Sequence, residues 1–91
     1  MDEKMRVLER NYATEILLAL RDGGDKCIAD VCLTEYGMNG TRHRRVKELE
    51  EAGLIEIRSN PRRCHNRKSL FLTERGRRVA DALAEIREVM P

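Results

Sequence analysis

The residues best suited to chemistry in this chain of 91 residues are cations, and they gather in its middle. Residues 42–68 carry nine Lys or Arg against four Asp or Glu, a net charge of +5, whereas the rest of the chain carries −3. From Arg58 to Lys68 there are five Lys or Arg and one histidine but no carboxylate. Such an asymmetry favours a polyanionic partner, because guanidinium and ammonium groups bind phosphate oxygens.

A catalytic constellation is missing from the sequence. There is no Gly-rich phosphate loop, no His-Glu-x-x-His motif and no Ser or Cys nucleophile with a recognisable base. We therefore expect a non-enzyme that carries no cofactor.

The three cysteines suggest packing rather than metal binding. Cys27 and Cys32 are five apart, which points their sulfurs to different faces of a helix, so we expect buried packing residues and no metal site. Cys64-His65 leaves a metal or redox-sensitive site open, because the neighbouring Arg63 would favour the Cys64 thiolate. We favour free thiols, since an odd cysteine count fits a reducing compartment.

Membrane association is not expected either. The longest wholly apolar run, residues 16–20, is far shorter than the ~20 residues needed to cross a bilayer, and no charged-then-apolar leader opens the chain. We expect a cytoplasmic protein.

The elements that must position the cations begin with helices. Apolar residues at three- and four-residue spacing predict a helix from about residue 3 to Gly23. Asn11 could instead cap a helix that starts there, with residues 1–10 as a separate arm, and both interpretations remain open.

Two further helices follow before the most basic stretch. The second is short and runs from a cap at Asp25 to a stop at Gly37, and the third spans 40–52 with Asn39 or Thr41 as its cap. Helices joined by a tight, Gly-containing turn form a helix-turn-helix candidate.

Two strands and a last helix complete the chain. Alternation of β-branched and charged residues predicts strands at 54–58 and 69–73, which form a hairpin with a long basic tip. The last helix, capped by Thr73, carries its apolar residues at spacings of four, three and four, the pattern of a seam that faces another helix. These residues are Val79, Leu83, Ile86 and Met90. We expect 74–90 to be a dimerisation helix of one domain spanning 1–91; alternatively, it packs back on the first helix alone.

This order of elements is that of a winged helix, and two strings make the resemblance specific. Residues 45–55 (RVKELEEAGLI) resemble the end of the recognition helix in MarR-type prokaryotic regulators, where that helix runs into the wing. Residues 72–76 (LTERG) resemble the start of the last helix in the same regulators. The resemblance covers roughly residues 11–90. It implies a mainly α fold with a small β-hairpin wing (α+β): a three-helix core, a wing and a C-terminal helix. It also implies a dimer that binds double-stranded DNA, with the third helix in the major groove and the wing along the backbone or minor groove.

Helical spacing assigns the cations of the third helix to faces. With Val46 and Leu49 inward, Arg44 and Lys47 face outward, where an Arg can donate two hydrogen bonds to guanine. MarR-type regulators place an apolar residue at position 42, so we expect Arg42 to point towards phosphate from the turn. The expected DNA-binding residues are Thr41, Arg42, His43, Arg44, Arg45 and Lys47 in the helix 40–52, and Arg62, Arg63, His65, Arg67 and Lys68 in the wing 58–68. The alternatives are a solvated helix face and a solubilising loop.

The functional expectation is a transcription regulator that binds double-stranded DNA as a homodimer, with no small-molecule effector assigned. The alternative is a winged helix used for protein–protein interaction or RNA binding, since a fold alone does not determine function.

Overall fold

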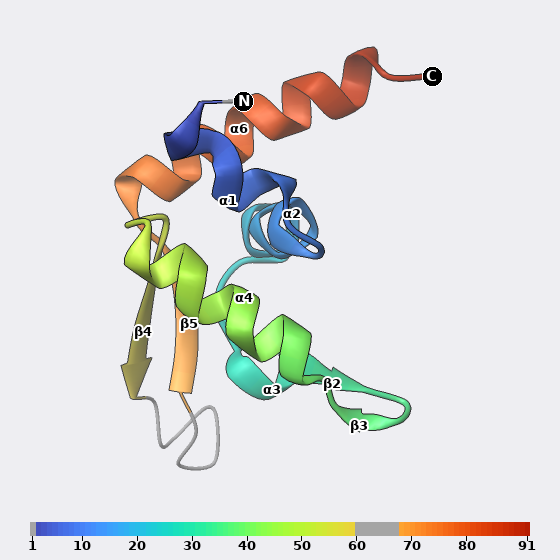
Figure 1. Cartoon of the computed structure of the whole chain (residues 1–91), viewed down its shortest axis with the longest axis vertical. Helices are drawn as coiled ribbons and strands as arrows, with labels where there is room; N and C mark the ends of the chain where they lie inside the picture. The colour runs from blue at the N-terminus through green and yellow to red at the C-terminus, as the bar shows by residue number, and fades with distance from the viewer. Residues whose placement is uncertain (1, 60–67) are drawn as a thin grey trace.

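The computed structural model describes residues 2–59 and 68–91, and it arranges helices around a small antiparallel sheet (Figure 1). The first half of the chain forms η1 (Glu3–Met5), α1 (Arg6–Glu9), α2 (Ala13–Gly23), β1 (Lys26–Cys27), α3 (Ile28–Cys32), β2 (Leu33–Thr34) and β3 (Gly37–Met38). The second half forms α4 (Gly40–Glu51), β4 (Ile55–Ser59), β5 (Lys68–Leu72) and α6 (Glu74–Val89). The winged-helix fold predicted from the sequence is confirmed, with β5 between β1 and β4 in the sheet.

Helix α2 lies at the centre of the core. It contacts α4, α6 and β5, and its apolar face is buried through Ile16, Leu17 and Leu20. Val46 and Leu49 of α4 are fully buried against this cluster, as expected. Burying each such side chain contributes roughly 1.5–3 kcal/mol, so the core holds α4 firmly in place.

The turn that follows α4 lies close to the start of α6, and this contact explains why residues 72–76 include Thr73 and Gly76. The Thr73 hydroxyl donates to the Gly53 carbonyl oxygen at 2.6 Å and accepts from the Gly76 N–H at 2.9 Å, so Thr73 caps α6 as predicted. A Cβ atom at Gly76 would lie 1.7 Å from the carbonyl oxygen of Leu54. The contact therefore needs glycine at this position.

The first ten residues form a separate segment, which decides between the two interpretations of the N-terminus. Helix α1 ends at Glu9, and α2 begins at Ala13 after Tyr12, whose φ of 72° is left-handed. The separate arm is thus the correct interpretation, although the chain breaks at Tyr12 and not at Asn11.

The second predicted helix is wrong at both ends, because α3 begins at Ile28 after an N-cap at Cys27 and not after Asp25. Helix α3 ends at Cys32, and the next residues form the β2–β3 hairpin, residues 33–38, instead of continuing to Gly37. Thr34 closes this hairpin, because its hydroxyl donates to the Gly37 carbonyl oxygen at 2.9 Å and accepts from the Tyr36 N–H at 3.2 Å. This local hydrogen bonding competes with the helix.

Helix α6, which contacts α2, buries its small residues more deeply than its large apolar ones. Its buried residues are Gly76, Ala80 and Ala84. The apolar stripe predicted for this helix lies beside that contact: Val79 and Leu83 are half-buried against the core, whereas Ile86 and Met90 are exposed.

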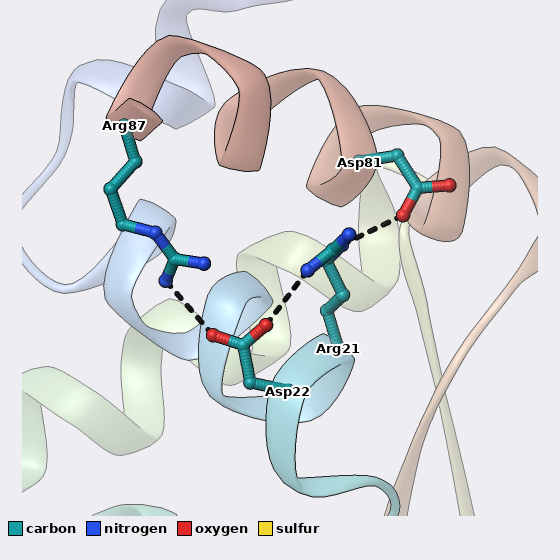
Figure 2. A network of polar contacts seen from close by, with 4 residues as sticks. All are labelled: Arg21, Asp22, Asp81 and Arg87. Carbon is teal, nitrogen blue, oxygen red and sulfur yellow. Dashed lines mark hydrogen bonds and ion pairs between the residues drawn. The ribbon is translucent and has the colours of Figure 1, made fainter. Parts of the chain in front are cut away.

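Ion pairs join the C-terminal end of α2 to α6 (Figure 2). Arg21 donates to Asp81 from Nε at 2.8 Å and to Asp22 from Nη1 at 2.9 Å, and Arg87 donates to the other Asp22 oxygen at 2.9 Å. Hydrogen bonds from Arg87 and then Arg21 lower the pKa of Asp22 below its usual value.

Candidate nucleic-acid interface

The elements expected to meet a polyanion lie at one end of the molecule. In Figure 1, the β2–β3 hairpin and the N-terminal end of α4 lie at the lower right, and the end of β4 and the start of β5 lie at the lower left, whereas α1 and α6 lie at the top. The side chain of Asn39 caps α4 by accepting from the Arg42 N–H at 2.9 Å, so Asn39 and not Thr41 is the cap. The N–H groups of a helix start carry partial positive charge, which adds to nearby cations.

Four of the predicted residues share the exposed face of α4. Thr41, His43, Arg44 and Lys47 are exposed. Within residues 2–59 and 68–91, neither Arg44 nor Lys47 has a carboxylate partner. Arg44 in the N-terminal half of α4 and Lys47 one turn further on are therefore able to bind an anion.

Arg42 does not belong to this exposed set. Its guanidinium donates to Glu15 at 3.1 Å and to the Val31 carbonyl oxygen at 3.3 Å, and it lies 4.4 Å from the centroid of the Tyr12 ring. The expectation that Arg42 points towards phosphate is therefore wrong. The Arg42 guanidinium instead stacks on the Tyr12 ring.

The Arg45 side chain also makes its hydrogen bonds within the fold. Only 7% of it is exposed, and its guanidinium donates to the Asn11 carbonyl oxygen at 2.9 Å and to Glu48 at 2.6 Å. The assignment of Arg45 as a phosphate contact is corrected for this reason. Sequence spacing missed it, because a long side chain at the edge of a helix face can fold inward.

The wing is described only at its base. Arg58 is exposed, yet its guanidinium pairs with Glu56 at 2.9 Å and lies 5.0 Å from the Phe71 ring centroid. Lys68 is exposed where β5 begins, opposite Ser59. The other predicted wing residues, Arg62, Arg63, His65 and Arg67, lie outside the described residues.

At the opposite end, an apolar groove of ≈ 640 Å³ collects three of the four residues predicted for the dimer interface. Val79, Leu83 and Ile86 line it together with Met5 and Leu8 from the N-terminal segment. Met90 lies beyond this groove, beside Ile86 in a smaller hollow.

The cysteines differ from one another. Cys32 is a free, fully buried thiol, as expected, and burial raises its pKa although the charge of Arg42 opposes the shift. The expectation of a free thiol is wrong for Cys27, which is half-buried and disulfide-bonded. Cys64 and the adjoining histidine lie outside the described residues. In the part of the chain that is described, no three His, Cys, Asp or Glu side chains could hold a metal ion.

A membrane-spanning helix is also absent from residues 2–59 and 68–91.

The apolar β2–β3 hairpin was not predicted from the sequence. Leu33, Tyr36 and Met38 are all exposed on it. A signal was present, because Thr34 and Gly37 are turn-forming residues that flank Tyr36.

Comparison with known proteins identifies the fold but no sequence relative. No family model matches the chain, and no curated protein sequence does. Among solved structures, MarR matches with a TM-score of 0.74 and 22% identity over 96% of this chain and 59% of its own. BpsR from Bordetella bronchiseptica, whose DNA binding is regulated by 6-hydroxynicotinic acid, matches with a TM-score of 0.69 and 20% identity over 96% and 62%.

A third match is to a DNA complex. A mutant of MepR from S. aureus, bound to an oligodeoxyribonucleotide, has a TM-score of 0.66 and 22% identity over 98% of this chain and 66% of that one. The chain spans only 59%, 62% and 66% of the length of these three structures. At these identities the similarity establishes a MarR-type winged-helix fold.

Proposed function

We propose that this chain, whose fold is the MarR-type winged helix, binds double-stranded DNA as a homodimer and regulates transcription. One observation carries the proposal: Arg44 is exposed in the N-terminal half of α4, the half that a recognition helix presents to base edges, and it has no carboxylate partner among residues 2–59 and 68–91. Lys47, one turn further along the helix, is exposed as well. The BpsR and MepR structures, which share this fold, are described as DNA-binding or DNA-bound.

In the proposed interface, α4 recognises the bases and the wing binds the DNA backbone. Arg44 is the candidate for a bidentate contact with guanine, while Thr41, His43 and Lys47 surround it on the same exposed face. Lys68 and, from sequence alone, Arg62, Arg63, His65 and Arg67 supply the wing with charge for the phosphate backbone or a narrow minor groove.

The homodimer accounts for the groove at the other end of the molecule. Met5 and Ile86 are exposed large apolar residues that line it, and a second copy related by a two-fold axis would cover both. Two recognition helices would then read two half-sites of a palindromic operator.

The test begins with a duplex selected from a random DNA pool and a scrambled duplex of the same composition. Arg44→Ala should weaken binding to the selected duplex by about 1–3 kcal/mol and relax preference at one base pair, because a base contact carries sequence information. Arg63→Ala and Arg67→Ala should weaken both duplexes nearly alike and lower the salt slope by about one unit each. Arg6→Ala is the matched control, since Arg6 is exposed on α1 at the opposite end.

Two outcomes would refute the proposal. Should folded Arg44→Ala bind both duplexes as the parent does, α4 is not the reader and a protein-interaction role gains support. Equal affinity for an RNA duplex of matching sequence would also contradict it, because the deep, narrow major groove of RNA excludes a helix.

A further inference from the structure

The β2–β3 hairpin is a well-fixed projection rather than a loose loop. Leu33 pairs with Met38 and Thr34 with Gly37 in antiparallel register, and the Thr34 hydroxyl bridges the turn. Gly37 has a φ of 102°, a conformation that L side chains rarely adopt. The turn therefore favours glycine at this position, and its shape is held by the Thr34 hydrogen bonds.

The hairpin is fastened to the start of α4. The Asn39 N–H donates to the Cys32 carbonyl oxygen at 2.8 Å across the base of the hairpin, while the Asn39 side chain caps α4. One residue thus joins both elements, which fixes the hairpin relative to Thr41 and Arg44. Figure 1 shows the hairpin projecting beyond the N-terminal end of α4.

The surface of the hairpin is apolar and carries no cation. Leu33 is 58%, Tyr36 91% and Met38 52% exposed, and none of the residues from Leu33 to Thr41 is Lys or Arg. Glu35, also exposed, places one negative charge beside Tyr36. Large apolar side chains gathered on a rigid projection indicate a contact surface.

We propose that this hairpin is a second, uncharged DNA contact, which lies against the sugar–phosphate backbone at the edge of the groove that α4 enters. The inference rests on the proposed function. Because the hairpin extends α4 rigidly at its N-terminal end, a duplex that receives Arg44 meets the hairpin next. The Tyr36 hydroxyl donates to a phosphate oxygen, as tyrosine does in many protein–DNA complexes, and Met38 packs on deoxyribose.

An uncharged contact leaves a distinctive signature. A cation that binds phosphate releases counterions and steepens the salt dependence of binding, whereas Tyr36 releases none. Glu35 should weaken DNA binding, because phosphates repel a nearby carboxylate. The hairpin should therefore affect affinity without the salt signature of the wing.

The experiment compares four variants of the full chain on the selected and scrambled duplexes across a salt titration. Tyr36→Phe should weaken binding to both duplexes about twofold to tenfold, the range of one net hydrogen bond, and Tyr36→Ala should weaken it further. Both should keep the parental salt slope. Glu35→Gln should tighten binding, most at low salt, whereas Glu88→Gln, an exposed glutamate on α6 at the opposite end, should bind as the parent does.

The outcomes separate this inference from the function on which it rests. If the parent binds the selected duplex and the Tyr36 and Glu35 variants bind it equally well while folded, the hairpin does not touch DNA and its apolar surface is left for a protein partner. If Arg44→Ala has no effect either, the proposed function itself fails.

Discussion

The Nε atom of Arg45 on α4 donates a hydrogen bond of 2.9 Å to the main-chain carbonyl oxygen of Asn11, at the break between α1 and α2. The same guanidinium pairs with Glu48 at 2.6 Å, and Glu48 also accepts from Arg10 at 3.4 Å. The helix proposed to read DNA is thus tied to the N-terminal segment by a cation that faces inward.

Arg45→Ala should therefore lower stability rather than alter DNA reading. We expect the free energy of unfolding to fall by about 1.5–3 kcal/mol, the range for a hydrogen bond to a charged group in a buried setting. Chemical denaturation measures this loss, with Arg44→Ala as the control, because Arg44 is exposed on the same helix. A stable Arg45→Ala protein that has lost a unit of salt slope would instead restore Arg45 as a phosphate contact.

Arg42→Leu tests the second inward arginine. Leucine keeps an apolar side chain beside the Tyr12 ring, the lost Glu15 pair is exposed and the lost hydrogen bond to the Val31 carbonyl oxygen is 3.3 Å long, so the free energy of unfolding should fall by no more than about 1 kcal/mol. The salt slope of DNA binding should stay at the parental value. A drop of about one unit would show that Arg42 reaches phosphate in the complex.

Gly76→Ala should be among the most destabilising single changes in the chain. The added Cβ would lie 1.7 Å from the Leu54 carbonyl oxygen, so the start of α6 must move away from Leu54. Overpacking of this kind costs about 1–3 kcal/mol or more, which the midpoint of urea denaturation measures. Arg77→Ala, an exposed neighbour, should leave the midpoint nearly unchanged, and equal midpoints for the two variants would contradict the close contact.

The ion pairs of Figure 2 predict a pH effect at the acidic end of the range. Hydrogen bonds from Arg87 and Arg21 lower the pKa of Asp22 below its ordinary value of 3.8. The stabilisation is therefore complete above pH 3.8 and is lost as the pH falls through the lowered pKa. Asp22→Asn should be less stable than the parent at neutral pH, and the difference should vanish in strong acid.

The solvent exposure of these side chains determines how large the pH effect should be. Asp22 and Arg87 are exposed, so the effect should be small and should shrink as salt is added. Glu85→Gln, which removes an exposed carboxylate of α6 outside the ion-pair network, is the control. A pH-independent difference between Asp22→Asn and the parent would point to packing rather than to charge.

Much of the second half of the fold could be predicted from the sequence, because its signals are local. The Asn39 and Thr73 caps act within one helical turn, and α4 and α6 begin where these caps place them. The spacing of Val46 and Leu49 marks the face of α4 that is buried. The strands β4 and β5 are each shifted by one residue from the prediction, β4 towards the C-terminus and β5 towards the N-terminus.

The first half was harder to predict because tertiary contacts override local pattern there. Tyr12 takes a left-handed conformation in the middle of an unbroken apolar periodicity, beneath the Arg42 guanidinium and beside the carbonyl group that Arg45 binds. No spacing rule places two arginines of α4 on that break. These inward contacts explain why Arg42 and Arg45, two of the six DNA-binding residues predicted on α4, pack within the fold. The other four are exposed on its surface.

The final prediction concerns the groove between the N-terminal segment and α6. If a second copy covers it, Ile86→Asp should place a charge in a buried interface and shift the protein to monomer, as sedimentation at micromolar concentration would reveal. Ile86 is 56% exposed in one chain, so the monomer should keep its helical content. Arg77→Asp, which adds the same carboxylate at another exposed position of α6, should remain dimeric. A parent protein that sediments only as a monomer, with or without DNA, would rule out the homodimer and the palindromic operator with it.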